Sequence, residues 1–151
     1  MPDIVTPENR SRMMAGIKAK NTKPEMQIRS MLHRMGFRYR LHVSTLPGKP
    51  DIVFGTMHAT IFVNGCFWHG HDCPMFKLPT TNTDFWTEKI LANKKRDLKH
   101  ISDLNYLGWR VLTIWECALR GKQKNPPDLI ANEIAEWLRN GKSNLYIRSY
   151  E

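Results

Sequence analysis

The spacing of apolar residues predicts a first helix that begins just after residue 21. Thr22, Pro24 and Glu25 form a capping-box pattern, in which proline is tolerated in the first turn. Gly36 is a natural end for this helix, because glycine readily adopts the left-handed conformation found there. Between these signals the apolar residues recur with helical periodicity, at Ile28, Met31, Leu32 and Met35.

Short apolar runs predict three strands after this helix. Residues 37–41 form the first run, and residues 51–54 form the second, after a turn built on Leu-Pro-Gly-Lys-Pro at 46–50. A tight connection at 55–57 leads into the third run, at 59–63.

The rest of the chain alternates between helix and strand. A long helical pattern from about residue 83 runs toward Leu107 and ends at Gly108, an apolar strand follows at 109–115, and an amphipathic helix follows at 126–141. The order helix, strand, strand, strand, helix, strand, helix predicts an α/β fold. We expect a central mixed sheet flanked by helices.

Length and charge bear on organisation and partners. The chain has 151 residues, which fits one domain, and carries 23 Lys and Arg against 14 Asp and Glu, a formal net charge of +9. Such a basic chain favours an anionic polymer, and nucleic acid is the commonest one. We expect a basic N-terminal arm at 1–20, a main domain at 21–141 with an irregular loop at 64–79, and a C-terminal tail at 142–151.

Membrane and secreted classes are disfavoured. No apolar run approaches the roughly 18 residues needed to span a bilayer, and the start of the chain lacks the apolar region of a signal peptide. Three cysteines are an odd number, which argues against a disulfide framework and favours metal binding or free thiols. We therefore expect a cytoplasmic protein with no membrane partner.

A Cys/His cluster in the irregular loop predicts a zinc site. The segment Cys-Phe-Trp-His-Gly-His-Asp-Cys at 66–73 holds four candidate ligands, and Cys117 follows a predicted strand from which it can return to the loop. Buried free thiols are the alternative, but a loop with Gly70 and Asp72 is a poor core segment. We expect a tetrahedral structural site with no position open for a substrate. Its four ligands are Cys66, His71, Cys73 and Cys117, which leaves His69 free.

One face of the long helix combines an aromatic residue, a base, an amide and an acid. These recur at i, i+3, i+7 and i+11, as Trp86, Lys89, Asn93 and Asp97. Leu91 and Leu98 fall on roughly the opposite side, where we expect them to be buried. Aromatic residues are more often core than ligand-binding, and the face could be an ordinary solvated one. The exposed position of Trp86 favours stacking on or between bases, and Phe67 and Trp68 are further candidates.

Acidic residues at the starts of elements suggest catalytic chemistry. Asp51 opens a strand beside a basic turn, where it could ligate Mg²⁺ for phosphodiester cleavage. Glu25 either completes the capping box or acts as an outer carboxylate that holds water at the metal. His69 could be a general base that Asp97 orients. Spacing alone leaves open whether these four residues converge.

Four motifs in order along the chain carry a family resemblance. They are Thr-Lys-Pro-Glu at 22–25, Leu-Pro-Gly-Lys-Pro-Asp at 46–51, Gly-Cys-Phe-Trp-His-Gly-His at 65–71, and the stretch from Gly-Trp-Arg-Val to Trp-Glu-Cys-Ala-Leu-Arg at 108–120. The chain resembles the very short patch repair (Vsr) endonucleases from about residue 10 to residue 120. This resemblance implies a restriction-endonuclease-like fold with a structural zinc. It also implies nicking of one DNA strand 5′ of the T in a T·G mismatch, such as deamination of 5-methylcytosine produces.

The resemblance also implies roles for residues of the catalytic site. Asp51 and the backbone carbonyl of Val63 would ligate Mg²⁺, His69 would be the general base supported by Asp97, and Glu25 would hold water at the metal. Zinc would be bound by the Cys₃His set given above.

Further implied roles concern the DNA. Phe67, Trp68 and Trp86 would wedge into the duplex beside the mismatch, while Lys89 and Asn93 would contact the mispaired bases. The N-terminal arm would lie in the minor groove. The implied substrate is double-stranded DNA with a T·G mismatch in the bacterial cytoplasm or nucleoid. A functional link to a cytosine-5 methyltransferase and to mismatch-repair proteins follows from the same resemblance.

The chain departs from the wider pattern at two places. The strand at 60–63 lacks the lysine that many restriction-endonuclease-like enzymes carry after their aspartate, so the route through His69 is needed. Position 64 is Asn, where a relative in the family has a histidine that contacts the scissile phosphate. Asn64 keeps the hydrogen bond and loses cationic assistance. Val63 replaces a threonine of that relative, which matters less for a backbone ligand.

Two other classes of function remain in view at this stage. A catalytically silent, zinc-containing DNA-binding module is the main alternative, and an RNA-binding protein that uses its aromatic residues on single strands is a more distant one. Neither has a reason to assemble the set Glu25, Asp51, His69 and Asp97. The sequence therefore favours a Mg²⁺-dependent, mismatch-specific DNA nicking enzyme.

Overall fold

The computed structural model describes residues 21–149 of the chain. Within these residues five strands form one sheet in the order of the sequence: β1 (Arg40–Leu41), β2 (Ile52–Phe54), β3 (Ala59–Asn64), β4 (Arg110–Trp115) and β5 (Leu145–Ile147). Neighbouring strands are antiparallel from β1 to β3 and parallel from β3 to β5, so the sheet is mixed.

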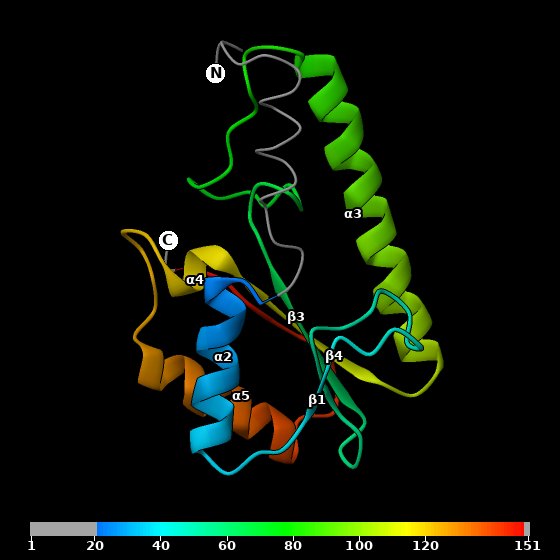
Figure 1. The fold of residues 1–151 in the computed structure, drawn as a ribbon, viewed down its shortest axis with the longest axis vertical. Helices are drawn as coiled ribbons and strands as arrows, with labels where there is room; N and C mark the ends of the chain where they lie inside the picture. Colours follow the sequence, from blue (N-terminus) through cyan, green and yellow to red (C-terminus); the bar gives the residue numbers. More distant parts are fainter. Residues whose placement is uncertain (1–20, 150–151) are drawn as a thin grey trace.

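Helices lie on both sides of the sheet. Figure 1 shows α2 (Lys23–Arg34) and α5 (Pro127–Asn140) together on one side, with the long helix α3 (Thr83–Tyr106) on the other. A short helix, α4 (Glu116–Leu119), directly follows β4. Among these helices, none is long and apolar enough to cross a bilayer.

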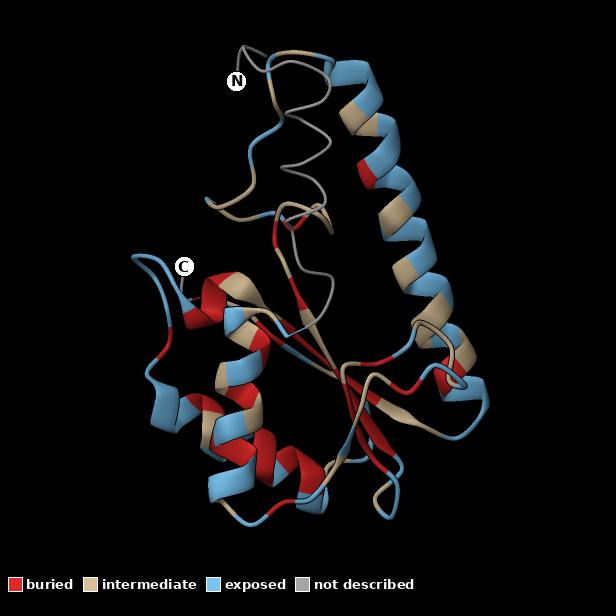
Figure 2. Ribbon diagram, in the orientation of Figure 1, coloured by how far each residue is buried: buried red, intermediate tan, exposed pale blue. Residues whose placement is uncertain are grey.

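The hydrophobic core lies mainly between the sheet and the pair α2 and α5 (Figure 2). Ile28 and Leu32 are fully buried, as the helical spacing predicts, and they pack with Ile134 of α5. All three residues of β2 are buried, because this strand lies inside the sheet with helices over it. Burial of these apolar side chains supplies most of the free energy that holds the layers together.

The predicted order of elements is confirmed, with two additions. Helix α4 is not among the predicted elements, and residues 142–151 are predicted as a tail. Residues 145–147 instead form β5, which pairs parallel with β4 through Ile147 opposite Ile114. A three-residue strand shows no usable periodicity, so its pairing depends on the free edge that β4 offers. The predicted basic arm at 1–20 lies outside the described residues.

The predicted burial of two leucines on α3 is wrong. Leu91 is 53% exposed and Leu98 is 68% exposed, whereas the buried residues of this helix are Ile90 and Leu104. Most of α3 stands clear of the core, as Figure 2 shows by its largely exposed surface. The helix contacts the rest of the protein along a narrow stripe, so amphipathic spacing alone pointed to the wrong face.

Arg110 ties β4 to the end of α5. Its guanidinium donates to the backbone carbonyls of Trp137 (2.7 Å), Gly141 (2.9 Å) and Met57 (2.9 Å). The carbonyls at the end of a helix lack partners within the helix, and a cation is favoured there. Arg110 therefore acts as a cap for α5 while it lies at the start of β4.

We predict that Arg110→Ala lowers the free energy of unfolding by about 2–3 kcal/mol, because several carbonyls lose a charged donor. Arg110→Lys should recover only part of this, since an ammonium cannot reproduce the planar fork. Urea unfolding followed by circular dichroism measures both values. Arg96→Ala, at an exposed arginine of α3, serves as the control. An unchanged midpoint in Arg110→Ala would contradict this assignment.

Candidate active site

The site lies at the edge of the sheet where β3 and β4 end. These strands are parallel and in register up to Asn64 opposite Trp115, so their carboxyl ends meet at the same edge. Strand β2 is antiparallel to β3 and begins at this edge, immediately after Asp51. The loop after β3 and helix α4 after β4 therefore bring distant motifs to one place.

Two carboxylates from different elements meet at this edge. The Val63 N–H donates to Asp51 Oδ2 (2.8 Å), and the Asp51 carboxyl is also hydrogen-bonded to Glu25. Burial raises the pKa of Asp51 to about 7. The Val63 hydrogen bond and His69 oppose that rise, while Glu25 adds to it. A cation bound beside Asp51 would stabilise its ionised carboxylate and so lower this pKa.

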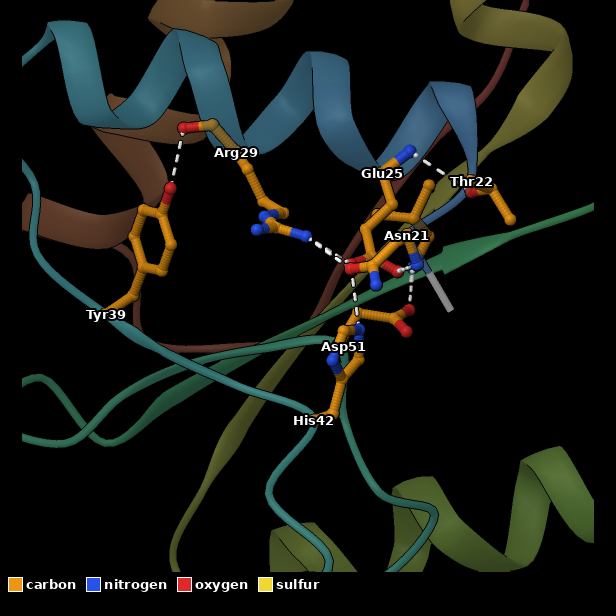
Figure 3. Close-up of polar contacts among 8 residues, drawn as sticks. Asn21, Thr22, Glu25, Arg29, Tyr39, His42 and Asp51 are labelled. Atoms are coloured by element: carbon orange, nitrogen blue, oxygen red, sulfur yellow. Dashed lines mark hydrogen bonds and ion pairs between the residues drawn. The ribbon is translucent and has the colours of Figure 1, made fainter. Parts of the chain in front are cut away.

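Glu25 takes part in both the helix start and the site. Thr22 Oγ1 accepts from the Glu25 N–H (3.3 Å), and Glu25 Oε1 accepts from the Asn21 N–H (3.1 Å). Its other oxygen, Oε2, faces His42 Nε2 (2.8 Å) and Arg29 (3.2 Å). Figure 3 shows this carboxylate directed from α2 toward Asp51. The two readings of Glu25, a cap and a site carboxylate, are therefore compatible.

His69 and Asp97 form a hydrogen-bonded pair. His69 Nδ1 lies 2.5 Å from Asp97 Oδ2, and each side chain is 28% exposed. His69 comes from the loop after β3 and Asp97 from α3, which explains why their separation in sequence could not establish the contact. His69 also acts electrostatically on Asp51, so the pair belongs to the same site as the carboxylates.

The four predicted zinc ligands converge. The ligand atoms of Cys66, His71, Cys73 and Cys117 all lie within 4.8 Å of one another. His71 Nδ1 is 3.7 Å from Cys66 Sγ and 3.6 Å from Cys117 Sγ. Tetrahedral zinc with ordinary bond lengths would separate such S and N atoms by about 3.6 Å. The cluster is therefore consistent with a zinc site.

The surroundings of the cluster suit metal ligands. Trp115 stacks on the His71 ring, with centroids 4.1 Å apart, and so fixes its orientation. Burial raises the pKa of the Cys66 thiol and lowers that of His71. Both shifts favour uncharged ligands in the free protein. A bound cation would stabilise the thiolate that the buried site otherwise disfavours.

The C-terminal segment closes over this cluster. The Ser149 N–H donates to Cys117 Sγ (3.4 Å), and the Arg148 guanidinium donates to Asp72 Oδ1 (2.8 Å) and to the Asp72 carbonyl (2.9 Å). Residues of the predicted C-terminal tail are thus neighbours of the metal cluster. Nothing in the spacing of the sequence indicated this.

An aromatic cluster borders the site. Phe67, Trp68 and Trp86 touch edge to face, with ring centroids 5.2–5.8 Å apart. Phe76 and Phe85 extend the cluster, and Phe85 is exposed. Phe85 and Trp86 form an aromatic pair that is visible in the sequence, whereas Phe76 was not predicted.

The polar candidates near the aromatic residues differ in their surroundings. Asn93 Nδ2 donates to the Trp68 carbonyl (2.8 Å), so this side chain holds the loop against α3. Lys89 is exposed on the same helix. Asn64 is buried at the carboxyl end of β3. The side-chain amide of Asn93 therefore already makes a hydrogen bond within the protein.

His42 is a member of the site that sequence reasoning missed. The ligand atoms of Glu25, His42 and Asp51 lie within 4.8 Å of one another. His42 follows β1 and has φ of +47°, a conformation that non-glycine residues seldom adopt. A single histidine between a strand and a turn carries no spacing signal, so only the tertiary structure reveals it.

Comparison with known proteins fits this site. The family profile for "DNA mismatch endonuclease Vsr" matches residues 2–75. The chain is 43% identical over 138 residues to the DNA mismatch endonuclease Vsr of Escherichia coli strain K12, across 91% of this chain and 88% of that protein. This chain belongs to the Vsr DNA mismatch endonuclease family. Membership confirms the predicted resemblance and the restriction-endonuclease-like fold class.

Two type II nicking enzymes are also similar to this Vsr-family chain. V.XorIIP of Xanthomonas oryzae pv. oryzae is 47% identical over 119 residues, across 79% of the chain and 88% of that enzyme. V.NmeAIP of Neisseria meningitidis is 45% identical over 122 residues, across 81% and 87% respectively. The similar proteins therefore include a DNA mismatch endonuclease and type II nicking enzymes, so similarity alone does not select one substrate for this chain.

The metal cluster gives a first prediction for the site. Cys117→Ser should remove most of the bound zinc and lower Tm by about 10 °C, because a structural zinc contributes several kcal/mol to folding. Metal analysis by atomic absorption and a thermal melt measure the two effects. His33→Gln, an exposed histidine on α2, should keep one zinc per chain. A full complement of zinc in Cys117→Ser would refute the ligand set.

The buried Asp51 gives a second prediction. Its pKa is about 7 in the folded chain against 3.8 for an ordinary aspartate, so ionising it destabilises the fold as pH rises from 4 to 7. Without added divalent metal, Asp51→Asn should therefore melt higher than the parent at pH 8, and the gain should shrink as pH falls toward 4. Glu133→Gln, exposed on α5, should show no such trend. Equal Tm values for Asp51→Asn and the parent throughout would contradict the burial argument.

Proposed function

We propose that this chain is a Mg²⁺-dependent DNA endonuclease that nicks one strand 5′ of the T in a T·G mismatch and so begins very short patch repair of deaminated 5-methylcytosine. The observation that supports this most is a juxtaposition. The carboxylates Glu25 and Asp51 and the pair His69 and Asp97 lie at one edge of the sheet, beside an aromatic cluster. A module that only binds DNA gains nothing from such a set of acids and a base.

The residues present suit a magnesium ion. Asp51 would hold it together with the carbonyl of Val63, whose N–H already contacts the same carboxylate. Two facing carboxyl groups with a raised pKa at Asp51 form a site in which a cation relieves repulsion. Glu25 would orient water near the ion. When bound, Mg²⁺ supplies positive charge that stabilises the negative charge developing on the phosphate oxygens.

His69 is the proposed general base. With Nδ1 donating to Asp97, the Nε2 atom is left as the acceptor that takes a proton from the attacking water. Asp97 fixes the ring and stabilises the imidazolium that forms, as in other His–carboxylate pairs. The strand at 60–63 has no lysine, so this histidine takes the role of base.

Selectivity is proposed to come from the aromatic cluster. Phe67, Trp68 and Trp86 would enter the stack beside the mispair, where unstacking costs least. Lys89 and the remaining polar atoms of Asn93 would contact the mispaired bases. Asn64 would hydrogen-bond the scissile phosphate. The basic arm at 1–20 would add contacts in the minor groove.

Zinc is proposed to be structural. Cys66, His71, Cys73 and Cys117 would occupy all four positions of a tetrahedral site and leave none for substrate. The ion would fix the loop at 64–79, which carries His69 together with Phe67 and Trp68 of the aromatic cluster. We further propose that the enzyme acts in the bacterial cytoplasm on the nucleoid, linked in function to a cytosine-5 methyltransferase and to mismatch-repair proteins.

A nicking assay with Mg²⁺ tests this function. A T·G duplex should be nicked only 5′ of the mispaired T, and the matched T·A duplex should stay intact, across varied flanking sequences. Asp51→Ala should lower the nicking rate by about 1,000-fold or more while mismatch binding survives, because metal stabilisation is worth several kcal/mol and each 1.4 kcal/mol is about tenfold.

The control and the contrary outcomes are well defined. Glu133→Ala, at an exposed position of α5, should nick like the parent. Binding of the mismatch by the parent without a nick would favour the silent DNA-binding module. Full activity in Asp51→Ala would remove this residue from the site, and preference for single-stranded RNA would replace the proposed function altogether.

A further inference from the structure

Glu25 is held from several directions in a nearly closed environment. Its carboxylate is 2% exposed, and its Oε2 atom accepts from His42 Nε2 at 2.8 Å and from Arg29 Nη1 at 3.2 Å. The Asn21 N–H donates to the other oxygen. Because donors on different sides hold both oxygens, the carboxylate cannot rotate without losing hydrogen bonds. Its orientation toward Asp51 is therefore fixed.

His42 connects the Glu25 carboxylate to the backbone of Asp51. Its N–H donates to the carbonyl of Asp51 (3.1 Å), while its ring reaches Glu25. The segment before it is also tied to α2, because the Tyr39 hydroxyl donates to the carbonyl of Arg29 (2.8 Å). Figure 3 shows Arg29 and His42 at the Glu25 carboxylate, with Tyr39 at the other end of Arg29.

The left-handed backbone at His42 fits this connecting role. A φ of +47° costs free energy in a histidine and persists only where surrounding contacts enforce it. Two of those contacts, to Asp51 and to Glu25, are in the site itself. The strained conformation therefore aims this ring at a particular oxygen.

The ring of His42 has two roles open to it within the cluster. It could ligate a metal directly, or it could hold Glu25. One ring nitrogen cannot do both, and Nε2 is already at hydrogen-bond distance from Glu25 Oε2. The observed geometry matches the second role.

We propose that His42 is a positioning residue, which holds the Glu25 carboxylate in the orientation that the Asp51 metal site requires. Arg29 shares this task and balances the buried charge. The inference rests on the proposed function and goes beyond it, since it concerns a residue to which that function assigns no role. Partners of this kind typically change metal affinity or activity by about 10–100-fold.

Two variants of similar size separate positioning from mere packing. His42→Leu fills the space without a donor, whereas His42→Gln keeps an N–H that can reach Glu25. Mn²⁺ binding to the DNA-free protein is measured by electron paramagnetic resonance. Nicking of T·G DNA with Mg²⁺ gives kcat, and fluorescence anisotropy without divalent metal gives the Kd for the same duplex. His33→Ala, an exposed histidine on α2, is the control.

His42→Leu should weaken Mn²⁺ binding and lower kcat by about 10–100-fold, with the DNA Kd unchanged. His42→Gln should recover most of both losses, and His33→Ala should match the parent. The proposal is overturned if His42→Gln is as impaired as His42→Leu, or if His42→Leu binds Mn²⁺ like the parent. A parent that binds Mn²⁺ but never nicks T·G DNA would refute the proposed function, while the Mn²⁺ comparison would still judge the role of His42.

Discussion

Strands β3 and β4 pair in parallel from Ala59 with Arg110 to Asn64 with Trp115, and the candidate site depends on that pairing. Parallel strands end at the same edge, so the loop after β3 and the helix after β4 emerge side by side. Antiparallel β2 begins at this edge as well, directly after Asp51. A slip by one residue between β2 and β3 would separate Asp51 from Val63 and would turn every side chain of the moved strand to the other face.

The loop at 64–79 does two things at once. Its Cys66, His71 and Cys73 gather with Cys117 into the metal cluster, while His69 and the pair Phe67 and Trp68 face the carboxylates and α3. An irregular loop has little core of its own to hold it, so the rigid geometry of a metal cluster substitutes for packing. Loss of the cluster should thus affect both the proposed base and the proposed wedge.

The carboxyl groups of Asp51 and Glu25 are held close together in an electrostatically unfavourable arrangement. Asp51 has a raised pKa because it is buried and faces Glu25, and His42 and Arg29 hold that glutamate in place. A fold optimised only for stability would replace such groups by apolar ones. Their presence beside a His–carboxylate pair is what a site for a cation and a phosphodiester requires.

The sequence by itself determined the order of most elements, the capping of α2 and the four members of the metal cluster, because these follow from local periodicity, cap chemistry and ligand type. It also supplied Asp51, His69 and Asp97 as candidates. Only the tertiary structure decided that His69 meets Asp97, that His42 joins Glu25, that β5 completes the sheet and that Leu91 is exposed. Each of these depends on contacts between residues distant in sequence, and local propensity carries no information about which surfaces the sheet register will bring together.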